Sequence, residues 1–184
     1  MAQGSQLYHA RIQLADTDRQ CYETLAFSTP QHPSEKPERL VLRLLAYALL
    51  YEPGLEFRKG GLSEGEAPDL AIRDGSNRIL HWIDLGTPAL GRLRKAARHT
   101  PKVSVVTHEG LLLRWKRQHG NQLPDFQGDI LSLDEELVVT LSRSLPRRFD
   151  WQATISGGVL YLDSTEASRS SPLRRLSPGQ LGSL

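Results

Sequence analysis

Residues 66–88, EAPDLAIRDGSNRILHWIDLGTP, read as one β-strand, a tight turn and a second β-strand. Apolar residues on both sides of the DGSN segment predict this hairpin, because Asp, Gly, Ser and Asn favour tight turns. Asp69 falls in the first strand and Asp84 in the second, each among apolar residues. A carboxylate in each of two neighbouring strands raises the question of what neutralises the two charges.

The register of the hairpin decides whether these two carboxylates meet. If DGSN is the loop, Arg73 pairs with Arg78, and Asp69 lies opposite Trp82. Asp84 is then a diagonal neighbour of Asp69 on the same face of the sheet, roughly 7–8 Å away at the backbone. At that separation the two side chains are able to converge on a single cation.

Apolar periodicity and turn residues extend this interpretation to the rest of the chain. Strands are expected at 7–15, 21–28, 55–60, 102–107 and 127–133, with a second hairpin at 150–164 that turns at Gly157-Gly158. Helices are expected from an N-cap at Ser34 to about residue 52, with Pro37 in the first turn, and at 88–99, 109–120 and 134–145. This order predicts an α/β (α+β) fold with a central mixed β-sheet flanked by helices.

Composition narrows the class of protein. Residues 1–163 are expected to form a single domain, and 164–184, rich in Ser, Arg, Pro and Gly, to form a flexible tail. No apolar run approaches roughly 18 residues and no N-terminal signal pattern is present, so no membrane association is expected. Cys21 is the sole cysteine, which excludes an intrachain disulfide and favours a cytoplasmic location. The six histidines lack zinc-site spacing, and the net charge of +2 does not by itself indicate nucleic-acid binding.

A third carboxylate lies on the first helix. On a helical wheel Glu38 falls at the N-terminal end of the apolar stripe that includes Leu42 and Leu45. A buried carboxylate needs a partner, so Glu38 either caps its own helix N-terminus or contributes to a metal site. The pattern favours neither alternative. Three carboxylates, Glu38, Asp69 and Asp84, would suit Mg²⁺ or Mn²⁺.

Four segments, HPSEKPERLVLRLLAY, APDL, WIDLG and RLRKAA, stand in an order and spacing that resembles the YaeQ family of bacterial proteins, over about Tyr8 to Asp163. The resemblance implies a restriction-endonuclease-like fold, a variant of the PD-(D/E)xK nucleases. In those enzymes a helix glutamate, the Asp of "PD" and a second acid bind a divalent metal ion. The matching positions here are Glu38, Asp69 and Asp84.

The departure from the nuclease motif is Gly86, which stands where the motif places its lysine, two residues after Asp84. The family resemblance makes Lys95, on the following helix, the candidate replacement. The helical wheel places Lys95 opposite the apolar stripe of that helix, so a solvated position is an equal alternative. Arg92 and Arg94 flank the stripe as further candidates for phosphate contact.

The resemblance therefore implies two different functions. The first is a divalent-metal-dependent nuclease with Glu38, Asp69, Asp84 and Lys95 as its site. The second is a catalytically inactive nuclease-fold protein that binds nucleic acid or a protein partner, in a role related to transcription. Candidate nucleic-acid contacts in either case are basic residues of the helix at 88–99: Arg92, Arg94 and Arg98.

Overall fold

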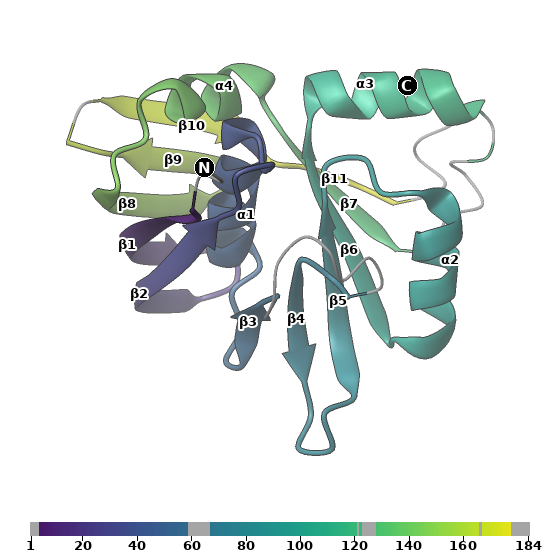
Figure 1. The fold of residues 1–184 in the computed structure, drawn as a ribbon. Helices are drawn as coiled ribbons and strands as arrows, with labels where there is room; N and C mark the ends of the chain where they lie inside the picture. The colour runs from purple at the N-terminus through teal and green to yellow at the C-terminus, as the bar shows by residue number, and fades with distance from the viewer. Residues whose placement is uncertain (1–3, 59–66, 121, 123–127, 166, 178–184) are drawn as a thin grey trace.

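The computed structural model describes residues 4–58, 67–120, 122, 128–165 and 167–177. These residues form two mixed β-sheets and four helices, arranged in alternating layers (Figure 1). The α/β class predicted from the sequence is confirmed, but the strands divide between two sheets instead of forming one central sheet. Within the described residues no helix is long and apolar enough to cross a membrane.

The first sheet has five strands in the order β10-β9-β8-β1-β2. Its members are β1 (Gln6–Asp16), β2 (Cys21–Gln31), β8 (Arg148–Ser156), β9 (Val159–Asp163) and β10 (Ser168–Pro172). The hairpin predicted at 150–164 is present as the antiparallel pair β8–β9, and the strands predicted at 7–15 and 21–28 also pair with each other, as β1 and β2. The long-range pairing of β1 with β8 is parallel and joins the two hairpins into one sheet.

The second sheet has six strands in the order β11-β7-β6-β5-β4-β3. Its members are β3 (Leu55–Phe57), β4 (Leu70–Arg73), β5 (Ile79–Leu85), β6 (Lys102–His108), β7 (Asp129–Leu133) and β11 (Arg174–Leu176). β5, β6 and β7 are parallel neighbours, so their carboxyl ends meet at one edge of the sheet. That edge positions the candidate site.

The helices are α1 (Pro37–Leu49), α2 (Leu90–His99), α3 (Glu109–His119) and α4 (Glu135–Ser144). Helices α1 and α4 pack between the two sheets, in a core shared by residues such as Ile12, Leu45 and Ile83. Helices α2 and α3 cover the other face of the second sheet, where Leu93 and Val105 belong to a separate apolar cluster. The layers therefore run sheet, helices, sheet, helices (Figure 1).

The N-cap of helix α1 lies two residues later than Ser34, the N-cap expected from the sequence. Lys36 is the residue that precedes the helix, and its side chain makes no capping hydrogen bond. The predicted place of Pro37 in the first turn is confirmed. The Ser34 hydroxyl is instead hydrogen bonded to Nδ1 of His32, at 2.7 Å, in the preceding loop.

The β4–β5 hairpin turns at DGSN as predicted, but its register is different. The Asp74 carboxylate accepts hydrogen bonds from the backbone N–H groups of Ser76 and Arg78, both at 2.9 Å, and fixes the turn. The register shifts between Ile72 and Arg73, so Arg73 pairs with Ile79 instead of Arg78, and Leu70 pairs with Ile83.

This shift corrects the expected position of Asp69. Ala71, not Asp69, is the partner of Trp82. Asp69 immediately precedes β4, next to the Leu70–Ile83 pair, and its backbone N–H donates to the Ile83 carbonyl at 2.9 Å. The irregularity in the strand therefore brings Asp69 level with Asp84, rather than diagonal to it.

The expected flexible tail is wrong for residues 168–176, which form β10 and β11. β10 extends the first sheet beside β9, and β11 extends the second sheet beside β7. Composition misled here because backbone pairing and the complete burial of Ser171 outweigh the polar sequence. Ser171 Oγ accepts from the backbone N–H of Asp134, at 2.9 Å, just before α4.

Replacing Ser171 tests the role of this segment. In S171A the partly buried N–H of Asp134 loses its acceptor, so the free energy of unfolding is expected to fall by about 1–2 kcal/mol. Urea denaturation measures the change, with S170A as the control because the Ser170 side chain is exposed. Equal stability of S171A and S170A would mean that the segment does not support the fold.

Candidate functional site

A cleft of about 770 Å³ opens where the parallel strands β5, β6 and β7 end. The three carboxylates selected from the sequence, Glu38, Asp69 and Asp84, all line this cleft. The carboxyl edge of a parallel sheet is a common ligand site in α/β proteins, because loops and helix ends converge there. The fold thus brings the three predicted acids into one depression.

Asp69 is buried, and its charge is neutralised by arginine. Nη2 of Arg39, on α1, lies 2.7 Å from both carboxylate oxygens, and Nη2 of Arg58 lies 3.7 Å from Oδ1. The backbone N–H of Leu85 donates to Oδ2 at 2.9 Å. The Asp69 carboxylate therefore ties the end of β5 to α1 through charge-assisted hydrogen bonds.

Asp84 is only 1% exposed, and Arg92 makes a two-point contact with its carboxylate. Nε of Arg92 donates to Oδ2 at 2.8 Å, and Nη2 donates to Oδ1 at 2.9 Å. The same guanidinium donates to the Ala67 carbonyl at 2.6 Å and lies 5.0 Å from the centre of the Trp82 ring. Arg92 is thus held in place by a carboxylate, a carbonyl and an aromatic face.

Glu38 differs from these two aspartates. It lies in the first turn of α1 and is partly buried, at the wall of the cleft. The more deeply buried acid of this region is Glu35, 6% exposed, which the sequence analysis missed. Its Oε2 accepts a hydrogen bond from Arg43 at 2.7 Å. Burial raises the pKa of Glu35, and this effect is larger than the opposing effect of the nearby arginines Arg43 and Arg39. The spacing of Glu35, Arg39 and Arg43, four residues apart, is the sequence signal that identifies this network.

His108 is a second residue that the sequence analysis passed over. It ends β6, is 3% exposed and lines the cleft. Its Nδ1 accepts from the backbone N–H of Leu111, at 3.4 Å, which caps α3 and leaves the proton of the neutral ring on Nε2. Burial lowers the pKa of His108, while the nearby Glu135 carboxylate acts in the opposite direction. Burial therefore favours the neutral form of this imidazole.

Lys95 does not line the cleft. It lies on the exposed side of α2 and lines a neighbouring pocket, together with Trp82 and Arg92. Arg94 and Arg98 are exposed on the same helix. Arg92, one turn before Lys95, is the basic residue that α2 places against Asp84.

The backbone conformation at Gly86 disfavours a lysine at this position. Its φ of 76° lies in the left-handed region, which residues with a Cβ atom rarely adopt. The Gly86 N–H donates to the Val106 carbonyl at 2.8 Å, so the turn is fixed to β6. A lysine at position 86 would have to adopt this strained conformation or break that hydrogen bond.

The carboxylates, as arranged, do not fit a bound divalent ion. Among the residues that the structure describes, no three His, Cys, Asp or Glu side chains are grouped so that they could hold a metal. Arg39 and Arg92 occupy the oxygen atoms of Asp69 and Asp84 that an ion would need. A metal would have to displace both guanidinium groups.

The fold and the cleft define a two-sheet α/β protein with a charged cleft at the carboxyl edge of its parallel strands. The family model described as "YaeQ protein" matches residues 1–172, and the chain belongs to this family.

Relatives and solved structures agree with this membership. The chain is 31% identical over 164 residues to the uncharacterized protein YaeQ of Escherichia coli (strain K12), covering 88% of this chain and 90% of that protein. Its identity to the Salmonella typhi protein of the same description is 32%, with the same coverage. The crystal structure of YaeQ protein from Xanthomonas axonopodis pv. citri is similar with a TM-score of 0.87 and 30% identity, covering 95% of this chain and 99% of that one. The Pseudomonas syringae YaeQ structure gives the same TM-score and identity, with coverage of 96% and 98%.

The D84N variant distinguishes an arginine-paired aspartate from a metal ligand. Loss of the charge leaves the largely buried Arg92 without its counter-ion, so the free energy of unfolding should fall by about 2 kcal/mol without added metal. Urea denaturation in EDTA measures the change. D150N is the matched control, because the Asp150 carboxylate is 69% exposed and 3.9 Å from Arg11. Increased stability of D84N would indicate that mutual repulsion of unneutralised carboxylates dominates, as in an empty metal site.

Proposed function

We propose that the cleft binds the phosphodiester backbone of nucleic acid, with arginines as the phosphate ligands. The observation that carries this proposal is the convergence of basic side chains from four segments of the chain at one edge of the sheet. They are Lys36, Arg39, Arg58, Arg92 and Arg114. Arginine suits phosphate because its planar guanidinium offers two parallel N–H donors to two oxygens.

In this proposal the two aspartates orient arginines rather than bind a metal. Arg39 and Arg92 are 32% and 21% exposed, so part of each guanidinium remains accessible from the cleft. Asp69 and Asp84 hold these groups in place before the ligand arrives, which reduces the entropy lost on binding. Lys36 and Arg114 are exposed at the rim, where they attract the polyanion from solution.

The charge balance of the cleft limits how tightly it binds phosphate. Its five basic side chains are matched by five acids, Glu35, Glu38, Asp69, Asp84 and Glu135. A bound phosphate must therefore share arginines with carboxylates, which supports moderate affinity and strong dependence on salt. The likeness of the "APDL" and "WIDLG" segments to the PD-(D/E)xK nucleases, with their restriction-endonuclease-like fold, supports nucleic acid as the source of the phosphate.

The double variant K36A/R114A tests phosphate binding. It should weaken binding of a short single-stranded oligonucleotide about equally for all sequences and reduce the dependence of log K on log salt concentration by about 2. Fluorescence anisotropy at several salt concentrations measures both. R11A is the control, since Arg11 is exposed on the first sheet, away from the cleft. An unchanged slope in K36A/R114A would contradict the proposal.

A metal-dependent nuclease is the second candidate, because Glu38, Asp69 and Asp84 line the same cleft. Mg²⁺ or Mn²⁺ would supply Lewis-acid stabilisation of phosphate charge. Glu38 is the carboxylate best placed to serve it, because it is partly exposed, in contrast to the buried and arginine-paired Asp69 and Asp84. Lys95, in the adjoining pocket, would supply positive charge only by extending across Arg92.

Mn²⁺ titration tests this second candidate. It predicts saturable binding of Mn²⁺ to the wild-type protein, measured by electron paramagnetic resonance, and cleavage of single- or double-stranded nucleic acid. Both should be lost in D84A and retained in D150A. Equal Mn²⁺ affinity of wild type and D84A, with no cleavage by either protein, would rule this candidate out.

A further inference from the structure

Two smaller pockets adjoin the cleft, and each shares an arginine with it. The first, the Trp82 pocket, has a volume of about 340 Å³ and shares Arg92 with the cleft. The second, the Arg73 pocket, has a volume of about 320 Å³ and shares Arg58 with the cleft. A ligand bound at either arginine in the cleft therefore lies next to a second depression.

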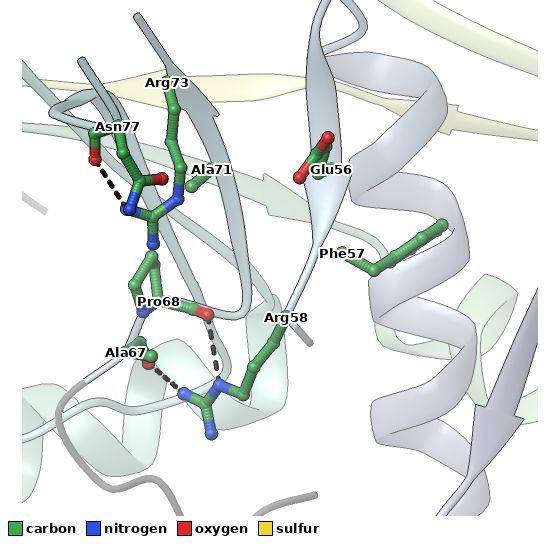
Figure 2. Close-up of a pocket in the computed structure, with 8 residues that line it drawn as sticks. All are labelled: Glu56, Phe57, Arg58, Ala67, Pro68, Ala71, Arg73 and Asn77. Atoms are coloured by element: carbon green, nitrogen blue, oxygen red, sulfur yellow. Dashed lines mark hydrogen bonds between the residues drawn. The ribbon is translucent and has the colours of Figure 1, made fainter. Parts of the chain in front are cut away.

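The two pockets differ in chemistry. Arg58 and Arg73 border the Arg73 pocket, but both guanidinium groups donate to backbone carbonyls, and the Glu56 carboxylate faces the same space (Figure 2). The Trp82 pocket instead has apolar walls from Ile79, Trp82 and Ala96, with Arg92 and Lys95 as cationic groups at its border. Apolar walls with a cationic border suit a planar aromatic ligand that carries negative charge at one end.

Trp82 is the tryptophan that is accessible to such a ligand. It is partly exposed, whereas Trp115 and Trp151 are 1% and 3% exposed in the core. The Arg92 guanidinium lies 5.0 Å from the ring centre of Trp82, and it also donates to the Asp84 carboxylate and the Ala67 carbonyl. The indole and the phosphate-binding arginine are therefore direct neighbours.

We propose that the Trp82 pocket receives a nucleobase of the strand whose phosphate is bound by Arg92 in the cleft. This inference rests on the proposed function and adds the substrate class, which is single-stranded or unpaired nucleic acid. A base must be out of its duplex stack to enter a pocket of this size. Lys95, which lines the pocket but not the cleft, supplies positive charge for the next phosphate.

The occupant follows from charge and position together. An apolar side chain of a protein partner would also fit the walls, but it carries no charge to complement the cationic groups at the border of the pocket. A nucleotide satisfies both requirements, because its base and its phosphate are joined at a short, fixed distance. Stacking of one base on an aromatic side chain raises the affinity of such complexes by about tenfold or more.

The test compares two short single-stranded oligomers of equal length, one with bases and one abasic, by fluorescence anisotropy. Wild-type protein should bind the oligomer with bases about tenfold more tightly. W82A should lose that difference while its affinity for the abasic oligomer stays unchanged, and Y22A, which removes a 63% exposed tyrosine from the other sheet, should keep it. Quenching of the wild-type tryptophan fluorescence by the oligomer with bases gives a measurement that needs no variant.

Each result has a defined meaning. Equal affinity of the wild-type protein for both oligomers, without quenching, overturns the base pocket but leaves phosphate binding intact. Equal weakening of both oligomers in W82A means that Trp82 acts only by holding Arg92, and this also overturns the inference. If W82A does not fold, W82F is used in its place. W82F retains an aromatic ring, so it should keep the preference for the oligomer with bases. Stacking is then supported only if that oligomer also quenches the fluorescence of the wild-type protein, and the absence of quenching overturns the inference. No binding of either oligomer overturns the base pocket and the proposed function together.

Discussion

The buried carboxylate of Asp69 is the constraint on which the site depends. The backbone N–H of Asp69 donates to the Ile83 carbonyl in β5, and the Asp69 carboxylate accepts from the Leu85 N–H. Arg39 on α1 neutralises the charge of this carboxylate. Without a cation, a carboxylate that is 5% exposed would be strongly unfavourable at this position. The position of α1 relative to the second sheet therefore depends on the Asp69–Arg39 ion pair as well as on apolar packing.

The same requirement is met at Asp84, whose carboxylate is neutralised by Arg92. Asp84 is on the face covered by α2, and the two-point contact with Arg92 fixes that helix against the carboxyl end of β5. Arg92 in turn lies over Trp82 and reaches the Ala67 carbonyl, so one side chain forms the wall between the cleft and the Trp82 pocket. The arginines are consequently structural elements whose partly exposed edges remain available to a ligand.

Sequence patterns predicted the elements well and their pairing less well. The apolar stripe of α1 and the DGSN turn are strong local signals, and both were confirmed. The irregularity between Ile72 and Arg73 shifts the register, and no local propensity specifies it. The strand containing Ser171 was missed for a related reason, because its burial comes from partners far away in the sequence.

The candidate site was predictable only in part, and the reason is physical. Acidic residues among apolar ones indicate that positive charge is required nearby. The placement of Glu38, Asp69 and Asp84 in one cleft with basic side chains agrees with that requirement. The sequence does not state what supplies the charge, because a divalent ion and a guanidinium are alternative partners for the same carboxylate. In this chain the left-handed backbone at Gly86 disfavours a lysine beside Asp84, and Arg92 approaches from α2 instead. An acidic nuclease-like motif is therefore compatible with either catalysis or binding, and the identity of the neutralising group is what separates the two.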